Sequence, residues 1–282
     1  MSLTFLAAAD VEQRLDAAGA SGALGAALEA GFDPETDPPR SAVALGAGEL
    51  LVMPSAVGGH AAVKLVSVGG DPRIQGLCVV FDGRTLAPVA LVDGIALTNL
   101  RTPAVSALAV RRLAAPHVRR LLVFGRGPQA HAHAEAMRAI RPIEHVDMIG
   151  RENGNVDELV AAADLICCCT TTREPLFDGE LVAEGATVVA IGSHEPGARE
   201  VDDALVRRAT VVVESRASAL REAGEVIGAI ASGALAEDSL MTLAELVRDE
   251  PALDPARPRL FKSTGMAWED AVVATALALG SH

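Results

Sequence analysis

Hydrophobic and polar positions give the first third of the chain a β-rich pattern. Between residues 41 and 94, short apolar runs follow one another and break at Gly, Asp or Pro, which is typical of strands joined by turns. Before them, apolar positions at helical spacing predict a helix over 9–30, followed by a turn-rich connector at 33–40. A long helix is predicted over 96–114, with Pro103 expected only in a first turn.

After about residue 118 the pattern changes to apolar strands that alternate with amphipathic helices. The predicted strands are "VRRLLVFG", "EHVDMIG", "LICCCTT", "ATVVAIGS" and "TVVVES". This alternation predicts a parallel, doubly wound sheet, and continuous apolar strands fit a sheet that is covered on both faces. The last stretch, "RLFKSTGMAWEDAVVATALALG", is predicted to be a loop followed by a long helix.

One edge of this sheet is predicted to be reduced. Only "ENGNV" separates the end of the second strand at Arg151 from the helix "DELVAAAD". A standard half of a doubly wound fold inserts another helix and strand at that point. We therefore expect an edge unit to be missing.

The turn after the first of these strands carries a glycine fingerprint. Gly125, Gly127 and Ala130 form a G-x-G-x-x-A pattern between an apolar strand and a helix, and the intervening residues are Arg126, Pro128 and Gln129. The first glycine permits a tight turn, the second lets the backbone approach a pyrophosphate, and the small third residue lets helix and strand pack closely. In this context the pattern predicts dinucleotide binding.

The second strand indicates which dinucleotide is bound. NAD-binding folds usually carry an acid at the tip of this strand, about 20 residues after the turn. Here the tip is Gly150-Arg151, and Arg151 can meet a 2′-phosphate. We therefore expect NADP, with NAD as the open alternative in which Arg151 lies over the adenine and Glu152 or Asp147 is nearby.

Composition narrows the classes of function. The 282 residues carry a formal net charge of −13, have no Tyr and a single Trp, so a nucleic-acid surface is not expected. No segment has the length and apolarity of a membrane span, and the N-terminus lacks the basic region of a signal peptide, so we expect a cytoplasmic protein. Adjacent cysteines and the His131-x-His133 spacing fit buried side chains better than a metal site.

Several stretches together resemble the ornithine cyclodeaminase/mu-crystallin family. They are "PPRSAVAL", "LTNLRTPAVSALA", "VFGRGPQAHAHAEAM", "ADLICCCTTTREPLF", "GSHEPGARE" and "LFKSTGMAWEDAVVATALA", in the family's order. The resemblance implies an α/β protein: a Rossmann-type doubly wound parallel sheet, residues 115–260, inserted in a β-rich α+β substrate and dimerisation domain, residues 1–114 plus 261–282. A homodimer is expected on the same basis.

The resemblance also implies a set of site residues. It places Arg40, Lys64 and Arg101 around a substrate carboxylate and Met53 in the pocket lining. It places cofactor contacts, besides the glycine turn, at Thr102, Ser106, Thr170, Lys262, Ser263 and Gly265. Arginine can grip a carboxylate bidentately and a partly buried lysine can hydrogen-bond it, which agrees with these roles. Without the resemblance, the residues alone would predict that the three cations are solvated surface charges, and Met53 could equally be a core residue.

His194 departs from the family pattern. Ornithine cyclodeaminases of the family carry an aspartate at this position, which holds the distal amine of the substrate. An imidazole suits acid–base chemistry near neutrality, but it anchors an ammonium less well than a carboxylate does. The alternative is that His194 is only a loop residue on the cofactor side.

These observations predict an NAD(P)-dependent oxidoreductase that acts on the C–N bond of a small amino acid or cyclic imino acid. Lys64, Arg101 and His194 are the expected catalytic residues. A cyclodeaminase, which is a lyase that releases ammonia without net redox change, is the first alternative. A non-catalytic NADP-dependent binding protein of mu-crystallin type is the second.

Overall fold

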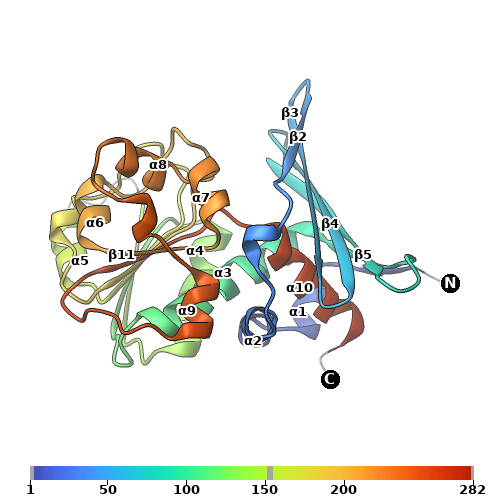
Figure 1. The fold of residues 1–282 in the computed structure, drawn as a ribbon, viewed down its shortest axis with the longest axis horizontal. Helices are drawn as coiled ribbons and strands as arrows, with labels where there is room; N and C mark the ends of the chain where they lie inside the picture. Colours follow the sequence, from blue (N-terminus) through green and yellow to red (C-terminus); the bar gives the residue numbers. More distant parts are fainter. Residues whose placement is uncertain (1–2, 151–154, 281–282) are drawn as a thin grey trace. The chain divides into compact units, whose positions relative to one another are not determined.

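The computed structural model describes residues 3–150 and 155–280 and divides them into two compact units. The first unit combines Met1–Val105 with Met266–His282, and the second is Ser106–Gly265. The division falls inside one helix, α3 (Gly94–Leu113), and just after the last strand, so it lies 5–9 residues from the expected domain boundaries at 114/115 and 260/261. The chain therefore leaves the first unit, builds the second and returns (Figure 1).

The first unit is built around a six-stranded sheet in the order β1-β6-β5-β4-β3-β2, antiparallel except for the β1–β6 pair. Its strands are β1 (Thr4–Leu6), β2 (Ser41–Leu45), β3 (Gly48–Val57), β4 (His60–Val68), β5 (Ile74–Asp82) and β6 (Pro88–Asp93). Its helices are α1 (Ala8–Arg14), α2 (Ala17–Glu29), the short 3-10 turn η1 (Pro34–Thr36), the first part of α3, and α10 (Ala267–Leu279). The predicted β-rich part is confirmed.

Alternation along the strands gives this sheet two different faces. Lys64 on β4 pairs with Met53 on β3 and with Cys78 on β5, and all three are buried. Helix α10 packs on β3, β4 and β5, and α2 packs on α10. This buried face, which we call the inner face, therefore places the predicted pocket residues Met53 and Lys64 in one row.

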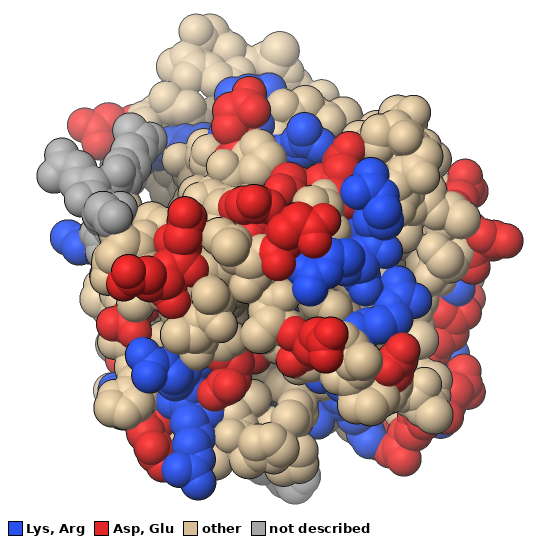
Figure 2. All heavy atoms as spheres, turned by 90° about the vertical axis from the view of Figure 1, so that its left-hand side faces the viewer, with Lys and Arg blue, Asp and Glu red and all other residues tan. Residues whose placement is uncertain are grey.

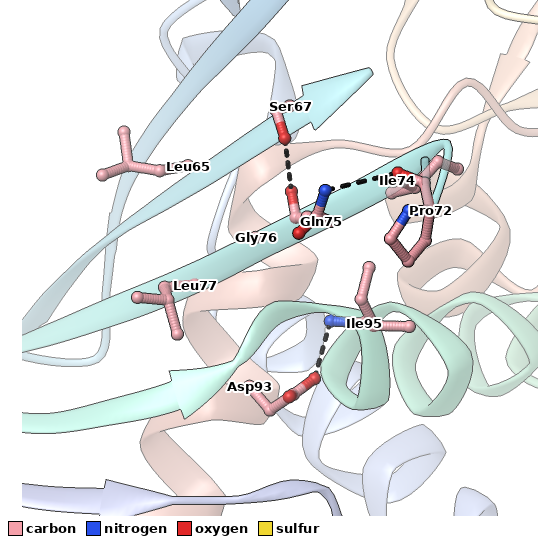
Figure 3. A pocket seen from close by; sticks show the side chains of 9 residues that line it. All are labelled: Leu65, Ser67, Pro72, Ile74, Gln75, Gly76, Leu77, Asp93 and Ile95. Atoms are coloured by element: carbon pink, nitrogen blue, oxygen red, sulfur yellow. Dashed lines mark hydrogen bonds between the residues drawn. The ribbon is translucent and has the colours of Figure 1, made fainter. Parts of the chain in front are cut away.

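The opposite face, the outer face, is apolar and partly exposed. Val52, Leu65 and Leu77 lie side by side on β3, β4 and β5, and Leu77 is 40% exposed. A cavity of about 650 Å³ opens beside Leu65 and Leu77 near the start of α3 (Figure 3). The Asp93 carboxylate in this cavity accepts hydrogen bonds from the backbone N–H groups of Ile95 and Ala96. It therefore caps the N-terminus of α3.

The second unit contains a seven-stranded, wholly parallel sheet in the order β12-β11-β13-β10-β9-β7-β8. Its strands are β7 (Arg120–Phe124), β8 (His145–Ile149), β9 (Leu165–Cys168), β10 (Thr187–Ala190), β11 (Thr210–Val213), β12 (Met241–Thr242) and β13 (Arg259–Lys262). Its helical segments, after the second part of α3, are α4 (Pro128–Ile140), α5 (Val156–Ala162), η2 (Gly179–Leu181), α6 (Asp203–Arg208), α7 (Arg216–Glu222), α8 (Gly224–Ala231), η3 (Glu237–Ser239) and α9 (Leu243–Asp249). The predicted doubly wound sheet is confirmed.

The order of the strands shows which end of this sheet is reduced and which strand fills its middle. Among the described residues, β8 pairs only with β7 and forms one edge, as the reduced spacing predicted. The expectation of a loop at Arg259–Lys262 was wrong, because these residues form β13 between β10 and β11. Each of the four residues is buried, Arg259 and Lys262 included, so a short strand far along the chain completes the middle of the sheet.

Three predicted helices needed correction. The helix over 9–30 is two helices, because the Asp16 side chain accepts the N–H of Gly19 at 2.8 Å and starts α2. The stretch "ASALREAGEVIGAIASG", which the alternation predicts as one helix after the strand "TVVVES", is likewise divided into α7 and α8 at Ala223. Pro103 lies inside α3 rather than in its first turn. An internal proline costs roughly 3 kcal/mol, and α3 continues through it with the neighbours Ala104 and Val105 fully buried.

The surface carries charges of both signs. On the face shown in Figure 2, Lys and Arg side chains lie among Asp and Glu side chains. Among the described residues, no helix has the length and apolarity needed to cross a membrane. The described residues also contain no group of three His, Cys, Asp or Glu side chains arranged to hold a metal ion.

Candidate active site

A buried cluster of charges lies in the first unit. Lys64 comes from β4, Arg101 from α3 and Asp270 from the first turn of α10. Lys64 Nζ donates to Asp270 Oδ1 at 2.9 Å, and Arg101 Nε donates to the same oxygen at 3.2 Å. Arg101 Nη1 also donates to Glu269 Oε2 at 2.6 Å. The structure therefore brings together two of the three cations predicted for the substrate carboxylate.

Burial makes this cluster electrostatically sensitive. Lys64 is 3% exposed, and burial is the main cause that lowers its pKa, against the raising effect of the Asp270 carboxylate. Its ammonium has three donors, and two of them bind Asp270 and, at 3.2 Å, the Thr98 hydroxyl. Among the described residues the third donor has no acceptor, so the ammonium can still bind an incoming carboxylate.

Arg40 lies on a segment whose neighbouring residues contact β3 and α10. It directly precedes β2, where Ser41 pairs with Val52, the neighbour of Met53. Three residues earlier, Asp37 accepts the backbone N–H of Trp268 on α10 at 2.9 Å, and burial raises the pKa of Asp37 to about 6. Arg40 is half-buried. The segment that carries it is thus held against the helix that carries Asp270.

Thr102 follows Arg101 on α3 and is also buried. Its Oγ1 has no hydrogen-bond partner among the described residues. A buried hydroxyl without a partner costs about 1–3 kcal/mol, which a ligand group could recover. The predicted ligand contact of Thr102 fits this observation and stays a prediction.

The glycine turn in the second unit has the geometry that a pyrophosphate requires. Gly125 has φ +119°, and a Cβ there would lie 2.6 Å from the carbonyl oxygen of Cys169. Gly127 is the N-cap of α4, with Pro128 as the first helical residue, and a Cβ on Gly127 would meet no atom within 4 Å. Ala130 is fully buried against Gly125. The space beside Gly127 at the N-terminus of α4 is therefore open, which suits a phosphate.

A groove of about 820 Å³ lies in front of this turn. It is lined by residues of the turn, the end of β8, the start of α5 and the loop after β9: Phe124, Gly125, Arg126, Gly127, Ile149, Gly150, Val156, Cys169, Thr170, Thr171, Thr172, Arg173, Pro175 and Leu176. The predicted cofactor residues Gly125, Arg126, Gly127 and Thr170 thus share one groove. Gln129 lies one residue further along α4, and Arg151 lies outside the described residues.

Ser106, another predicted cofactor contact, is engaged inside the second unit. Its Oγ lies 2.9 Å from Nε2 of His133, whose Nδ1 lies 2.8 Å from the Gln129 carbonyl oxygen. A carbonyl only accepts, so Nδ1 carries the proton and Nε2 accepts from the serine hydroxyl. Burial lowers the pKa of His133 to about 4, so the ring is neutral at pH 7. The Ser106 hydroxyl therefore joins α3 to α4.

Three buried carboxylates fix the loops at the carboxyl ends of the strands. Glu200 accepts the N–H and hydroxyl of Thr170 and the N–H of Gly192, and burial raises its pKa. Glu225 accepts the Ser193 hydroxyl and the N–H of Glu200. Glu214 accepts from Ser263, Thr264 and Gly265. These bonds hold the loops at the edge of the sheet where doubly wound folds bind ligands.

These contacts define the surroundings of the remaining predicted residues. Lys262 Nζ donates to the Ser193 carbonyl at 2.7 Å and forms an ion pair with Glu225 at 3.1 Å, so its ammonium is used inside the unit. Ser263 and Gly265 are held by Glu214. His194 follows the anchored Ser193 and is exposed. The roles of these residues toward a cofactor stay predictions.

Comparison with known proteins identifies the family. The ornithine cyclodeaminase/mu-crystallin family model matches residues 2–159 and 151–278. The chain belongs to this family. It is 34% identical over 228 residues to a Δ1-pyrroline-2-carboxylate reductase of Colwellia psychrerythraea, covering 72% of each chain. It is 34% identical over 220 residues to the ketimine reductase mu-crystallin of Mus musculus, covering 72% of this chain and 68% of the relative.

Solved structures show the same fold over nearly the whole chain. The Δ1-pyrroline-2-carboxylate reductase of Thermococcus litoralis, in complex with NADH and L-proline, is 26% identical with a TM-score of 0.89, covering 98% of this chain and 96% of that one. A probable ornithine cyclodeaminase of Bordetella pertussis Tohama I is 27% identical with a TM-score of 0.90 and the same coverage. The predicted family and fold class are therefore confirmed.

The sequence reasoning missed the acids that hold the cations. Glu269 and Asp270 are fully buried at the start of α10, yet the sequence analysis predicted only a long helix there and gave these acids no role. Two adjacent acids in the first turn of an apolar helix were the available signal. The carboxylates of Glu200, Glu214 and Glu225 were missed as well, because nothing local marks them as buried.

Proposed function

We propose that this protein is an NAD(P)-dependent reductase of a cyclic imino acid, of the Δ1-pyrroline-2-carboxylate or piperideine-2-carboxylate class. The observation that carries the proposal is the buried pair Lys64 and Arg101 around Asp270, in a chain that also has an open glycine turn. Relatives at 34% identity are named as reductases of such imines. The predicted reaction class, reduction at a C–N bond, agrees with those names.

The proposed reaction adds a hydride to the carbon of the C=N bond and a proton to its nitrogen. The imino acid, NAD(P)H and one proton give the amino acid and NAD(P)⁺. The cofactor, when bound, supplies the hydride. Arg101 and Lys64 bind the carboxylate, and Arg40 and Met53 complete that pocket. Because Asp270 fixes both cations, the carboxylate is oriented before the reaction begins.

The second unit is proposed to bind the cofactor. Gly125, Gly127 and the N-terminus of α4 take the pyrophosphate, with Pro128, Gln129 and Ala130 shaping that turn. Thr170, Lys262, Ser263 and Gly265 lie at or next to the carboxyl ends of β9 and β13, where the nicotinamide half is expected. Thr102 and Ser106 were predicted as further contacts; the engagement of Ser106 with His133 favours a supporting role for that residue.

His194 is proposed as a proton relay. It is exposed on a loop whose neighbour Ser193 is anchored by Glu225 and Lys262. An imidazole can both accept and donate a proton, whereas the aspartate of cyclodeaminases serves an ammonium. The cyclodeaminase alternative is therefore less favoured, and it predicts ammonia release from ornithine without net change in cofactor absorbance.

The deciding experiment is an assay at 340 nm with three substrates. Δ1-pyrroline-2-carboxylate, Δ1-piperideine-2-carboxylate and pyruvate with ammonia are each offered with NADH and with NADPH. Oxidation of the cofactor by one of the cyclic imines supports the proposal. A separate ammonia assay with ornithine and NAD(P)⁺ tests the lyase, and ammonia release there supports it. Cofactor binding without turnover in either assay supports the non-catalytic alternative.

The assembly is proposed to be a homodimer that uses the outer face of the six-stranded sheet. Val52, Leu65 and Leu77 form an apolar row on this face, and the cavity of Figure 3 extends it toward α3. A monomer rarely exposes a continuous apolar surface of this kind. A second copy of the same sheet offers a surface of matching character.

A further inference from the structure

The side chain of Arg126 lies beside the end of β8, the second strand of the parallel sheet in chain order. Arg126 stands between the two glycines of the turn, and its side chain extends along Gly150, directly after β8. A Cβ at Gly150 would lie 3.6 Å from Arg126 Nε and 3.9 Å from Cζ. The Gly125 N–H donates to the Ile149 carbonyl at 2.9 Å, which holds turn and strand end together. The guanidinium therefore lies where dinucleotide folds place the adenosine ribose.

The charges around this place favour an anion. The described lining of the groove contains two cations, Arg126 and Arg173, and no acid. Arg173 already forms an ion pair with Glu195 at 2.6 Å. Among the described residues Arg126 has no hydrogen bond or ion pair, and Gly150 presents no side chain that would exclude a bulky group. A phosphate can therefore accept bidentate hydrogen bonds from this guanidinium.

We infer that Arg126 is the specificity-determining residue that binds the 2′-phosphate of an NADP-type dinucleotide. The inference rests on the proposed function, because it needs the groove to bind a dinucleotide. It moves the discrimination from Arg151, which the sequence analysis expected to meet the phosphate, to a residue of the glycine turn. The bidentate fork of arginine fits a ribose phosphate, whereas the 2′-hydroxyl of NAD gives it only a weak neutral acceptor.

The test separates the phosphate contact from catalysis. Isothermal titration of the full-length protein with adenosine 2′,5′-bisphosphate and with 5′-AMP measures the adenosine site alone. The wild type should prefer the bisphosphate by about tenfold or more, as expected for one charge-assisted bidentate contact. Arg126→Ala should remove this preference and leave the affinity for 5′-AMP unchanged, and Arg126→Lys should keep part of it. Arg151→Ala and Arg173→Ala are the matched controls and should retain the preference.

The outcomes distinguish this inference from the proposed function. Equal binding of NADH and NADPH by the wild type, or loss of the preference in Arg151→Ala but not in Arg126→Ala, overturns the role of Arg126 and leaves a dinucleotide-binding protein. Failure of the wild type to bind NADH, NADPH and both fragments overturns the proposed function together with this inference. Because Arg126 is exposed, its replacement should leave the thermal midpoint unchanged, which verifies that the variant is folded.

Discussion

Asp270 serves both buried cations of the first unit, so a single substitution tests their role. Asp270→Asn keeps the size of the side chain but removes the charge that raises the pKa of Lys64. That pKa should fall further, and the alkaline limb of kcat/KM for the cyclic imine should move to lower pH. We expect a loss of about tenfold or more in kcat/KM, since a charge-assisted bond is worth about 1.5–3 kcal/mol.

The control for this variant is Glu269→Gln, which removes the acid bonded to Arg101 at 2.6 Å and leaves the Lys64 bond in place. Glu269→Gln should raise KM without moving the alkaline limb. A pH profile of Asp270→Asn that superimposes on that of the wild type would mean that Lys64 does not titrate with substrate binding.

His133 gives a pH dependence of stability. Its pKa is lowered to about 4 from 6.5, so the folded chain keeps the ring neutral where the unfolded chain protonates it. The resulting stability is fully present above pH 6.5 and is lost as the pH falls toward 4, by about 3 kcal/mol. Urea unfolding at pH 7 and pH 4 should show His133→Leu less stable at pH 7 but with a smaller loss on acidification. Equal losses in both proteins would assign the acid sensitivity to other groups.

Single residues show how far the sequence could predict the site. Lys64 and Arg101 were named through their resemblance to a family motif, and the structure brings them together. Asp270 was not named, because it lies 206 positions from Lys64 and 169 from Arg101. An ion pair between residues so far apart in the chain leaves no local sequence pattern. Only the folded structure shows that Asp270 is buried beside both cations.

At the scale of elements, the glycine turn joining β7 to α4 offers a test that separates folding from binding. Gly125→Ala would place a methyl 2.6 Å from the Cys169 carbonyl oxygen at φ +119°, so it should lower the thermal midpoint. Gly127→Ala meets no protein atom within 4 Å at φ −84°, so it should leave the midpoint unchanged. Its methyl should nevertheless weaken NADPH binding about tenfold by blocking the pyrophosphate. Fluorescence titration measures this, and wild-type affinity in Gly127→Ala would remove the turn from the cofactor site.

Elements also show what patterning predicts and what it misses. Strands β2 to β6 and the alternating order from β7 to β11 follow from local apolar periodicity, and the structure confirms them. Strand β13 was missed because its four residues follow a segment rich in proline and charge and pair with β10 and β11, about 70 and 50 residues earlier. This pairing depends on burial between two distant strands, and a short stretch of sequence carries no sign of that burial.

For the whole molecule, the outer face of the six-stranded sheet predicts the assembly state. Leu77 is 40% exposed at the centre of this face, and Leu86, 77% exposed, lies apart from it in the turn between β5 and β6. In a two-fold dimer both subunits carry any substitution, so Leu77→Glu buries two unpaired charges at a cost of several kcal/mol. Sedimentation velocity should therefore show a dimer for the wild type and for Leu86→Glu, and a monomer for Leu77→Glu. A monomeric wild type, or a Leu77→Glu variant that stays dimeric, would mean that this face meets something other than its own copy.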